Sequence, residues 1–269
     1  MYDNQRILIT GASAGIGREM ARQLAPRAKT LILVARRRER LDALKDELTA
    51  SHGSLQVLVE PCDLADLSAI DAMVERVEAA IGGVDVLINN AGFGDTGLFE
   101  RAPAEKLTAI VQVNCVALTH LTHRLLGPML KAGRGGILNV SSGFGFLWIP
   151  GVAVYAATKH YVTSMTEMLR LELRGTGVVV TQSCPGPVAT EFESVAGNPT
   201  GQSVPKLLEI SAERCARDSL RGLEKRRAMV LPGGLICVLM NLGRLVPRWV
   251  YRLFYSGVGG WLRKRPQAQ

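Results

Sequence analysis

A tyrosine and a lysine lie four residues apart in this sequence, and a serine precedes the tyrosine by thirteen residues. On a helix, Tyr155 and Lys159 would share one face, which brings an ammonium group close to a phenol whose ordinary pKa is about 10. A nearby cation favours the phenolate, so the pair predicts acid–base chemistry near neutral pH, and the hydroxyl of Ser142 can hold a substrate oxygen against the phenol. Because this spacing also occurs on ordinary amphipathic helices, the pair needs support from the rest of the chain.

Three glycines mark a turn close to the N-terminus. Gly11, Gly15 and Gly17 follow the apolar run at 6–10, and a helix is expected to begin at Gly15 and to end at Pro26. Without side chains at these positions, backbone N–H groups and the helix N-terminus can approach a pyrophosphate. A glycine cluster can also be only a tight turn, but its place directly after the first strand indicates a nucleotide site.

The residues after the second expected strand indicate which nucleotide is bound. Three successive arginines begin at Arg36, and no carboxylate is present there to hold a free ribose 2′-hydroxyl. Arginine suits a 2′-phosphate instead, so we expect NADP(H) rather than NAD(H). Arg36 is the leading candidate contact, with Ser13 and Arg37 as helpers, whereas Arg38 and Arg40 fit better as the solvated start of a helix.

Apolar runs alternate with helical patterns along the chain, which indicates a parallel sheet whose strands are covered on both faces. We expect strands near 6–10, 29–35, 55–60, 84–89, 135–141, 177–183 and 228–231. Helices are expected near 15–25, 38–50, 66–81, 103–131, 154–174 and 211–226. The predicted fold class is α/β: a single-domain, Rossmann-like, doubly wound parallel sheet of about seven strands with helices on both faces, which binds ligands at the C-terminal ends of its strands.

The domain prediction separates one large unit from a short extension. Residues 1–232 form the expected nucleotide-binding catalytic domain, which includes a substrate loop at 186–210. Residues 233–269 form an apolar and basic C-terminal extension rather than an independent domain.

Across residues 5–232 the chain resembles the short-chain dehydrogenase/reductase family, of the type often called its classical branch. Thr10-Gly11-x-x-x-Gly15-x-Gly17 is similar to the cofactor turn of that family, and Asn89-Asn90-Ala91-Gly92 to its fourth-strand motif. The resemblance implies the catalytic residues Asn114, Ser142, Tyr155 and Lys159. It implies cofactor contacts at Gly11, Ser13, Gly15, Ile16, Gly17, Arg36, Arg37, Asp63, Leu64, Asn90, Ala91, Gly92, Tyr155, Lys159, Pro185, Gly186, Val188 and Thr190. No metal is expected.

The resemblance also implies a role for each residue of the site. Tyr155 would exchange a proton with the substrate oxygen while hydride moves to or from the nicotinamide, and Ser142 would orient that oxygen. Lys159 would lower the pKa of Tyr155 and contact the nicotinamide ribose. Asp63 would hold the adenine and Thr190 the carboxamide.

Asn114 would support Lys159 through a water relay that reaches solvent. From the residues alone, Asn114 can equally be a satisfied buried amide.

Large apolar side chains surround the expected catalytic serine and tyrosine. We expect Phe93, Phe144, Trp148 and Phe192 to line the substrate pocket, which favours a hydrophobic ketone, aldehyde or alcohol. Simple loop packing is the alternative explanation of these side chains.

The net charge of +8 is concentrated at the C-terminal end. Residues 1–220 hold 22 Lys and Arg against 23 Asp and Glu, whereas residues 221–269 hold ten against one. No module for nucleic acid is visible, so nucleic acid is excluded as an expected partner. The five widely spaced cysteines are expected to be reduced core thiols, and the chain lacks a signal-peptide pattern, which predicts a cytoplasmic location.

The stretch Leu235–Tyr255 is apolar, but Gly243 and Pro247 interrupt it and make it too short to span a membrane comfortably. Arg244, Arg248 and Arg252 recur every four residues beside an apolar arc, close to Arg263-Lys264-Arg265. Two interpretations stay open: the segment covers the substrate cleft or a subunit interface, or it lies on an anionic membrane.

The leading hypothesis is therefore an NADP-dependent carbonyl reductase or alcohol dehydrogenase, which as a member of the family it resembles would form a homodimer or homotetramer through its two long helices. The alternatives are an NADP-sensing regulator or a peripheral membrane protein with little catalysis. A sensor can keep the glycine turn while it loses the catalytic tyrosine or lysine, and this chain keeps both.

Overall fold

Seven parallel strands form the central sheet of the computed structural model, which describes residues 1–192, 196–197, 209–233, 238, 242–243 and 245–264. In sheet order they are β3 (Gln56–Pro61), β2 (Thr30–Ala35), β1 (Arg6–Thr10), β4 (Val86–Asn89), β5 (Gly135–Val140), β6 (Val178–Ser183) and β9 (Met229–Val230). The chain winds outward from β1 to β3 and then resumes at β4 on the other side of β1. This reversal creates a switch point between β1 and β4, where such sheets bind ligands.

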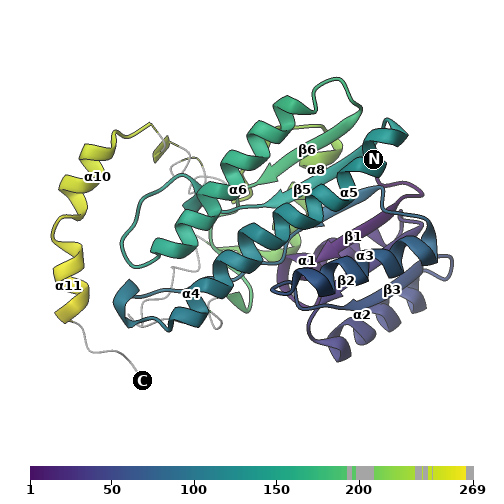
Figure 1. Ribbon diagram of the computed structural model, residues 1–269, viewed down its shortest axis with the longest axis horizontal. Coiled ribbons are helices and arrows are strands. Elements are labelled where there is room, and N and C mark those ends of the chain that lie inside the picture. The colour runs from purple at the N-terminus through teal and green to yellow at the C-terminus, as the bar shows by residue number, and fades with distance from the viewer. Residues whose placement is uncertain (193–195, 198–208, 234–237, 239–241, 244, 265–269) are drawn as a thin grey trace.

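Helices cover both faces of the sheet (Figure 1). One layer consists of α1 (Gly15–Leu24), α2 (Arg38–Ser51) and α8 (Ala212–Glu224), and the other of α3 (Leu67–Ile81), α5 (Leu118–Ala132) and α6 (Ala153–Glu172). Successive side chains of β1 alternate between the layers, because Ile7 and Ile9 pack into the first core and Leu8 into the second. The predicted doubly wound α/β fold is confirmed.

A wide turn interrupts the single long helix that was expected over 103–131. α4 spans Ala104–Val111, a π-helical turn spans Gln112–Ala117, and α5 follows without a break. A π-helical turn takes more residues than an α-helical turn, so the side chains around it leave the α-helical register. Asn114 lies within this turn and is only 1% exposed. The other expected helices begin and end within two residues of their observed bounds.

Short elements lie at the C-terminal edge of the sheet. Two 3₁₀ turns span Phe99–Arg101 and Gly143–Gly145, and β7 (Val188–Ala189) pairs in parallel with β8 (Ile210–Ser211). β7 and the first residue of β8 belong to the expected substrate loop at 186–210, of which residues 193–195 and 198–208 lie outside the described part of the chain.

The C-terminal extension contributes α10 (Arg248–Tyr255) and α11 (Val258–Lys264), which Figure 1 shows at the end of the molecule farthest from β3. The ring of Tyr251 packs edge-on against Trp148 with centroids 5.3 Å apart, and Arg263 forms an ion pair with Glu100 at 3.0 Å. No helix among the described residues is long and apolar enough to cross a membrane.

Candidate active site

A cavity of about 1080 Å³ opens along the C-terminal ends of the strands. The glycine turn after β1 and the arginines after β2 form one end of its lining, whereas Ser142, Tyr155 and Lys159 contribute to the other end. This volume slightly exceeds the range of about 300–1,000 Å³ for ligand pockets, which leaves room for a dinucleotide together with a substrate.

The predicted catalytic residues meet at the edge of β5. Tyr155 and Lys159 lie one turn apart on α6, and Ser142 follows β5; these three side chains are at most 8% exposed. Lys159 Nζ donates to the carbonyl oxygen of Val140 at 2.9 Å and lies 5.7 Å from the centre of the Tyr155 ring. The backbone N–H of Phe144 donates to Ser142 Oγ at 3.2 Å, so the serine hydroxyl can use its hydrogen toward a ligand.

Burial dominates the protonation of both groups on α6. It raises the pKa of Tyr155 to about 12, against a smaller lowering by Ser142, and it lowers the pKa of Lys159 to about 8. The sequence predicted that Lys159 would lower the pKa of Tyr155, and for the chain alone this prediction is wrong. The reason is that the tyrosine is removed from water while the ammonium group faces the Val140 carbonyl. The phenol is therefore held in its protonated form.

Asn114 is a fully engaged amide beside this cluster. Its Nδ2 donates to Phe93 O at 2.9 Å and to Thr158 Oγ1 at 3.0 Å, and its Oδ1 accepts from Phe93 N at 3.2 Å. The side chain does not line the cavity, and no direct hydrogen bond joins it to Lys159. A Cβ atom on Gly92 would lie 3.0 Å from Asn114 Oδ1 and 3.4 Å from Lys159 Nζ, so both side chains border this glycine.

The glycine turn presents the open start of α1 to the cavity. Ala14 precedes the helix and offers no capping side chain, so the first backbone N–H groups can serve a ligand. Gly11 and Gly15 have φ angles of 69° and 52°, which favour glycine. Gly17 does not line the cavity; its role is packing, because a Cβ there would lie 2.4 Å from the carbonyl oxygen of Gly11.

The predicted adenosine contacts gather at one end of the cavity. Ser13, Arg36, Arg37, Asp63 and Leu64 all line it. Arg37 Nη2 donates to the Ser13 hydroxyl at 3.3 Å, so the two residues predicted to help Arg36 lie next to each other. These residues, together with the open start of α1, fit the adenosine and pyrophosphate parts of an NAD(P) cofactor.

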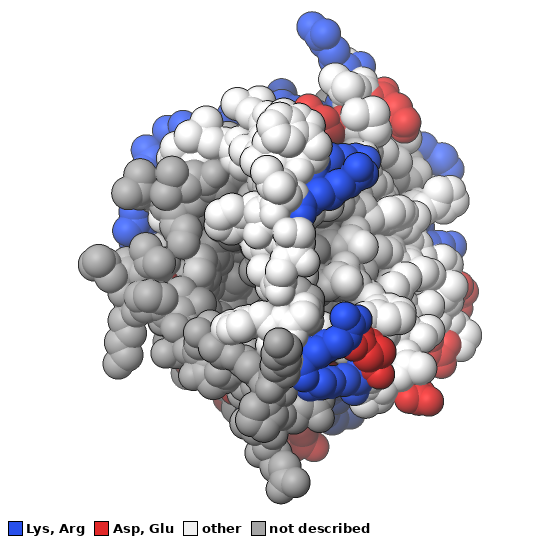
Figure 2. Space-filling view, turned by 90° about the vertical axis from the view of Figure 1, so that its left-hand side faces the viewer, with Lys and Arg blue, Asp and Glu red and all other residues white. Residues whose placement is uncertain are grey.

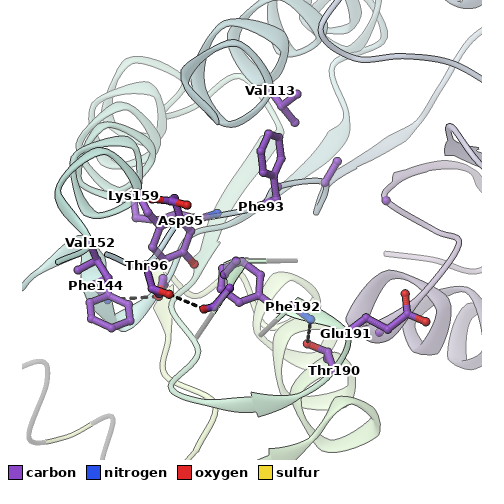
Figure 3. Close-up of a pocket in the computed structure, with 18 of the residues that line it drawn as sticks. Phe93, Asp95, Thr96, Val113, Phe144, Val152, Lys159, Thr190, Glu191 and Phe192 are labelled. Atoms are coloured by element: carbon purple, nitrogen blue, oxygen red, sulfur yellow. Dashed lines mark hydrogen bonds between the residues drawn. The ribbon is translucent and has the colours of Figure 1, made fainter. Parts of the chain in front are cut away.

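The remaining predicted cofactor contacts lie between the two ends. The lining includes Ile16, Asn90, Ala91, Gly92, Pro185, Gly186, Val188 and Thr190. Thr190 packs against the glycine turn: a Cβ atom on Gly15 would lie 3.0 Å from Thr190 Cγ2. Its Oγ1 accepts a hydrogen bond from Phe192 N at 3.2 Å (Figure 3).

Three of the four predicted pocket residues line the substrate end. The ring centres of Phe144 and Phe192 lie 5.9 Å and 5.2 Å from that of Tyr155, and Phe93 lines the same cavity (Figure 3). Trp148 does not line the cavity, and its predicted place there is wrong. It packs instead between His160 and Tyr251, because α10 covers the loop that carries it.

Sequence reasoning missed a set of lining residues. They are Asp95, Thr96, Arg101, Lys106, Glu191 and Leu262. Asp95 and Lys106 form an ion pair at 2.6 Å, so the substrate end is not entirely apolar. Some of these residues could have been found because they are close in sequence to Phe93 or Thr190, which were predicted to line the site. Leu262 could not have been found in this way, because it belongs to α11.

Cysteines and metal ligands form no further site in the described residues. In the part of the chain that the structure describes, Cys62, Cys115, Cys184 and Cys215 are not joined by disulfide bonds, and Cys237 lies outside that part. Burial raises the pKa of Cys62 and of Cys115 to about 11, which keeps both thiols protonated.

Comparisons with known proteins converge on one family. The profile described as short chain dehydrogenase matches residues 5–199. An NADP-dependent 3-hydroxy acid dehydrogenase of Salmonella typhi is 38% identical over 70% of this chain and 75% of its own length. A fatty acyl-CoA reductase of Mycobacterium tuberculosis is 34% identical over 93% of this chain and 83% of its own length.

Two solved structures share the fold. The short-chain dehydrogenase of Sphingobium yanoikuyae in complex with NADPH superposes with a TM-score of 0.79 at 29% identity, covering 98% of each chain. The bulky-bulky ketone specific alcohol dehydrogenase of Comamonas testosteroni has a TM-score of 0.76 at 26% identity, covering 99% of this chain and 97% of its own.

Proposed function

Because this chain belongs to the short-chain dehydrogenase/reductase family of NAD(P)-dependent oxidoreductases, which act on alcohol and carbonyl groups, we propose that it uses NADP(H) to reduce a hydrophobic ketone or aldehyde to its alcohol. One observation carries the proposal. A buried tyrosine, lysine and serine meet at the aromatic end of a cavity whose other end holds a glycine turn and two arginines.

The chain supplies the proton and the cofactor supplies the hydride when it is bound. Tyr155, kept protonated by burial, donates its proton to the carbonyl oxygen of the substrate. The Ser142 hydroxyl donates a hydrogen bond to the same oxygen, while its own oxygen accepts from Phe144 N–H. Lys159 would hold the nicotinamide ribose and provide positive charge beside the tyrosine, and the phenylalanine rings exclude water from the reacting atoms.

The preference for NADP(H) rests on the end of β2. Arg36 and Arg37 line the cavity there, and the strand ends at Ala35 without a carboxylate that could bind a free 2′-hydroxyl. The NADPH complex of the Sphingobium relative and the NADP-dependent relative from Salmonella agree with this preference.

The hydrophobic substrate rests on the rings of Phe93, Phe144 and Phe192. The names of two relatives, one acting on fatty acyl-CoA and one specific for bulky ketones, are consistent with it. Part of the C-terminal extension covers the cleft in this proposal, because Leu262 of α11 lines the cavity.

The test of catalysis is Tyr155→Phe with Tyr161→Phe as its control. Both tyrosines lie on α6, but Tyr161 is 42% exposed and bonds to the hydroxyl of Thr119. NADPH oxidation is followed with hydrophobic ketones and aldehydes of increasing length, and NADPH affinity is measured separately. We expect Tyr155→Phe to lose about 10²- to 10⁴-fold in kcat while it binds NADPH normally, and Tyr161→Phe to remain active. Full turnover by Tyr155→Phe would exclude the mechanism.

The competing hypothesis of an NADP sensor with little catalysis is not favoured, because all members of the catalytic set are brought together. It predicts NADPH binding without turnover of any carbonyl compound in the same series. The two hypotheses are therefore separated by the wild-type protein alone.

Contact of the C-terminal extension with an anionic membrane is part of the proposal. Leu245, Trp249, Leu253 and Phe254 are 65–77% exposed, and exposed arginines flank them. Figure 2 shows an uncharged band on this face with Lys and Arg side chains along one side. Such a surface suits the boundary between lipid headgroups and acyl chains. Arg244 and Arg265 of the predicted basic surface lie outside the described residues.

Flotation with vesicles tests this contact. We expect the wild type to float with phosphatidylserine-containing vesicles but not with purely neutral ones, and the double variant Leu253→Ser with Phe254→Ser to lose flotation. Leu130→Ser removes an exposed apolar side chain from α5 instead and serves as the control. Equal flotation of all three proteins would remove the extension from this role.

A further inference from the structure

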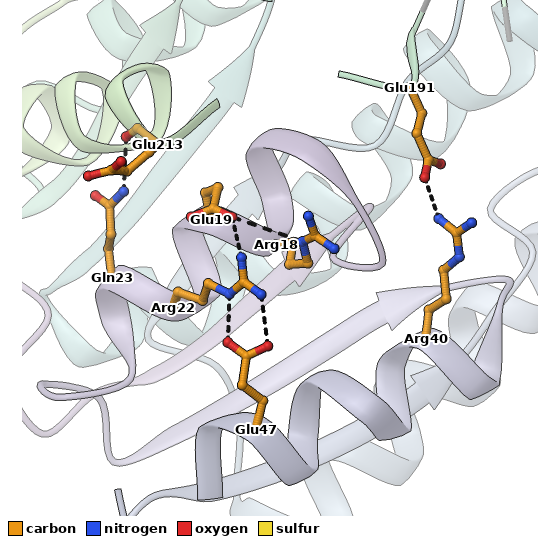
Figure 4. A network of polar contacts seen from close by, with 8 residues as sticks. All are labelled: Arg18, Glu19, Arg22, Gln23, Arg40, Glu47, Glu191 and Glu213. Carbon is orange, nitrogen blue, oxygen red and sulfur yellow. Dashed lines mark hydrogen bonds and ion pairs between the residues drawn. The ribbon is translucent and has the colours of Figure 1, made fainter. Parts of the chain in front are cut away.

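A carboxylate bridges the cofactor end of the cavity. Glu191 follows Thr190 after β7, whereas Arg37 and Arg40 lie at the start of α2, more than 150 positions earlier in the chain. Glu191 accepts hydrogen bonds from Arg37 Nη1 at 3.1 Å and from Arg40 Nη1 at 2.6 Å. Figure 4 shows the Arg40 side chain reaching from α2 to Glu191. The segment 188–192 is thus fastened across the cavity to the end of β2.

One of these arginines also belongs to the proposed 2′-phosphate site. Arg37 donates to the Ser13 hydroxyl from Nη2, and Arg37, Ser13 and Glu191 all line the cavity. Arg36, the leading phosphate contact, forms no ion pair with any residue in the described ranges. The Glu191 carboxylate therefore binds the guanidinium of Arg37, which the 2′-phosphate would also need, and it does not bind Arg36.

The bridge is weak enough for a phosphate to displace. The paired side chains are 45–48% exposed, and exposed ion pairs contribute little. Both arginines hold the pKa of the Glu191 carboxyl below its usual value, so the competing anion is a carboxylate with a single charge. A phosphate monoester carries about −1.5 to −2 charges near pH 7 and offers three acceptor oxygens, so it is the stronger partner for Arg37.

The same segment reaches the substrate end. Phe192 follows Glu191 directly, and its ring lies 5.2 Å from that of Tyr155. A Cβ on Gly94 would lie 2.9 Å from the Phe192 ring and 3.0 Å from that of Tyr155, so these aromatic side chains leave little free space. A change at Glu191 is therefore one residue from the wall of the substrate pocket.

We propose that Glu191 competes with the 2′-phosphate of NADP(H) for Arg37, so that NADP(H) binding breaks one of the two ion pairs that fasten the segment 188–192 in the cofactor-free chain and loosens the segment. This inference rests on the proposed use of NADP(H). It makes Glu191 a specificity-determining residue, which weakens the binding of nucleotides that carry a 2′-phosphate and leaves NADH binding unaffected.

Equilibrium binding of NADPH, NADH and adenosine 2′,5′-bisphosphate to the wild type and to Glu191→Gln tests the proposal without any turnover. We expect Glu191→Gln to bind NADPH and the bisphosphate about three- to tenfold more tightly, with NADH changed by less than about twofold. Asp42→Asn is the matched control. It also removes one acidic side chain beside the arginine run, but Asp42 pairs with Arg38, which does not line the cavity.

Hydrogen–deuterium exchange of the cofactor-free proteins provides a second measurement. We expect faster exchange at residues 188–192 in Glu191→Gln than in the wild type, and no change there in Asp42→Asn.

The binding measurements can overturn the proposal in two ways. If both variants gain equally in NADPH affinity, the gain comes from the loss of any negative charge near the arginines and not from Glu191 in particular. If Glu191→Gln binds NADPH as the wild type does, or more weakly, Glu191 does not compete with the phosphate. If neither the wild type nor Glu191→Gln prefers NADPH to NADH, the proposed cofactor fails as well. If the wild type prefers NADPH to NADH and Glu191→Gln shows the same preference, the proposed competition fails but the proposed cofactor stands.

Discussion

At the scale of single residues, the site depends on how burial sets the protonation of two side chains. Burial raises the pKa of Tyr155 and lowers the pKa of Lys159, although the two residues lie one helical turn apart. The tyrosine is thereby prepared to act as an acid toward a carbonyl oxygen. In the reverse direction it would need the additional positive charge of an oxidised nicotinamide cofactor to become a base.

The buried lysine predicts an unusual dependence of stability on pH. Because its pKa falls from 10.5 to about 8 on folding, the unfolded chain binds more protons between these values, and the free energy of unfolding gains a positive slope with pH. The raised pKa of Tyr155 has no effect until the pH exceeds about 10. We expect the stability of the wild type relative to Lys159→Met to rise by about 2 kcal/mol between pH 8 and pH 10. Urea unfolding of both proteins across this range measures the difference, and a flat difference would show that Lys159 keeps an ordinary pKa.

Residue identities were predictable where spacing in the chain carries the information. Ser142, Tyr155 and Lys159 were found because two lie one helical turn apart and the third follows a strand. The direction of the Tyr155 pKa was not predictable, since it depends on burial by distant segments. Trp148 was misplaced for the same reason, because α10 packs on it from more than 100 residues away. Glu191 could not be recognised, since its partners are on the other side of the cavity.

At the scale of elements, the glycine turn predicts a sharp contrast between two glycines. A Cβ on Gly17 would lie 2.4 Å from Gly11 O and 2.5 Å from Asn90 Nδ2, whereas Gly127 lies in α5 with nothing within 4 Å. We expect Gly17→Ala to be destabilised by about 2 kcal/mol or more and to weaken NADPH binding, because the turn must move. Gly127→Ala should change the stability by less than about 1 kcal/mol, because the better helix propensity of Ala is opposed by its contact with the ring of Pro128, the next residue in α5. Thermal unfolding and NADPH titration measure both, and equal behaviour of the two variants would contradict the close packing at Gly17.

The π-helical turn shows what periodicity cannot predict. Apolar spacing over 103–131 indicated one helix, and the chain there is helical throughout, but the pattern does not show an extra residue in one turn. That turn buries Asn114, whose amide joins the helix to Phe93 and Thr158. The selection of Asn114 as a candidate came from family resemblance rather than from any pattern in the residues.

Replacement of this amide tests its structural role. Asn114→Leu would leave the backbone groups of Phe93 without their partner, and we expect a loss of about 2–4 kcal/mol in the free energy of unfolding. Thr119→Ala on the same helix is the control, since Thr119 is part-buried and bonds mainly within its own helix and to exposed Tyr161. Similar stability losses in the two variants would argue against a special role of the Asn114 contacts.

At the scale of the whole molecule, one apolar surface is left exposed by the residues that the structure describes. Val111 and Val116, on α4 and the π-helical turn, are 41% and 36% exposed, and Tyr161, Met168 and Leu171 on α6 are 42–58% exposed. α4, the π-helical turn and α6 contact one another, and Tyr161 is joined to Thr119 by a hydrogen bond of 2.8 Å. Two long helices that expose large apolar side chains side by side form a surface suited to a second copy of the chain.

This surface predicts how an oligomer is broken. In a twofold interface each side chain near the axis faces its own copy, so Met168→Glu with Leu171→Glu would bring like charges together and bury them without partners. We expect this double variant to be a monomer by light scattering at concentrations where the wild type is a dimer or tetramer. Leu253→Glu with Phe254→Glu adds the same charge to α10 and should leave the oligomer intact. If the α10 variant dissociates and the α6 variant does not, the C-terminal extension is the subunit interface, and the surface available to a membrane is correspondingly smaller.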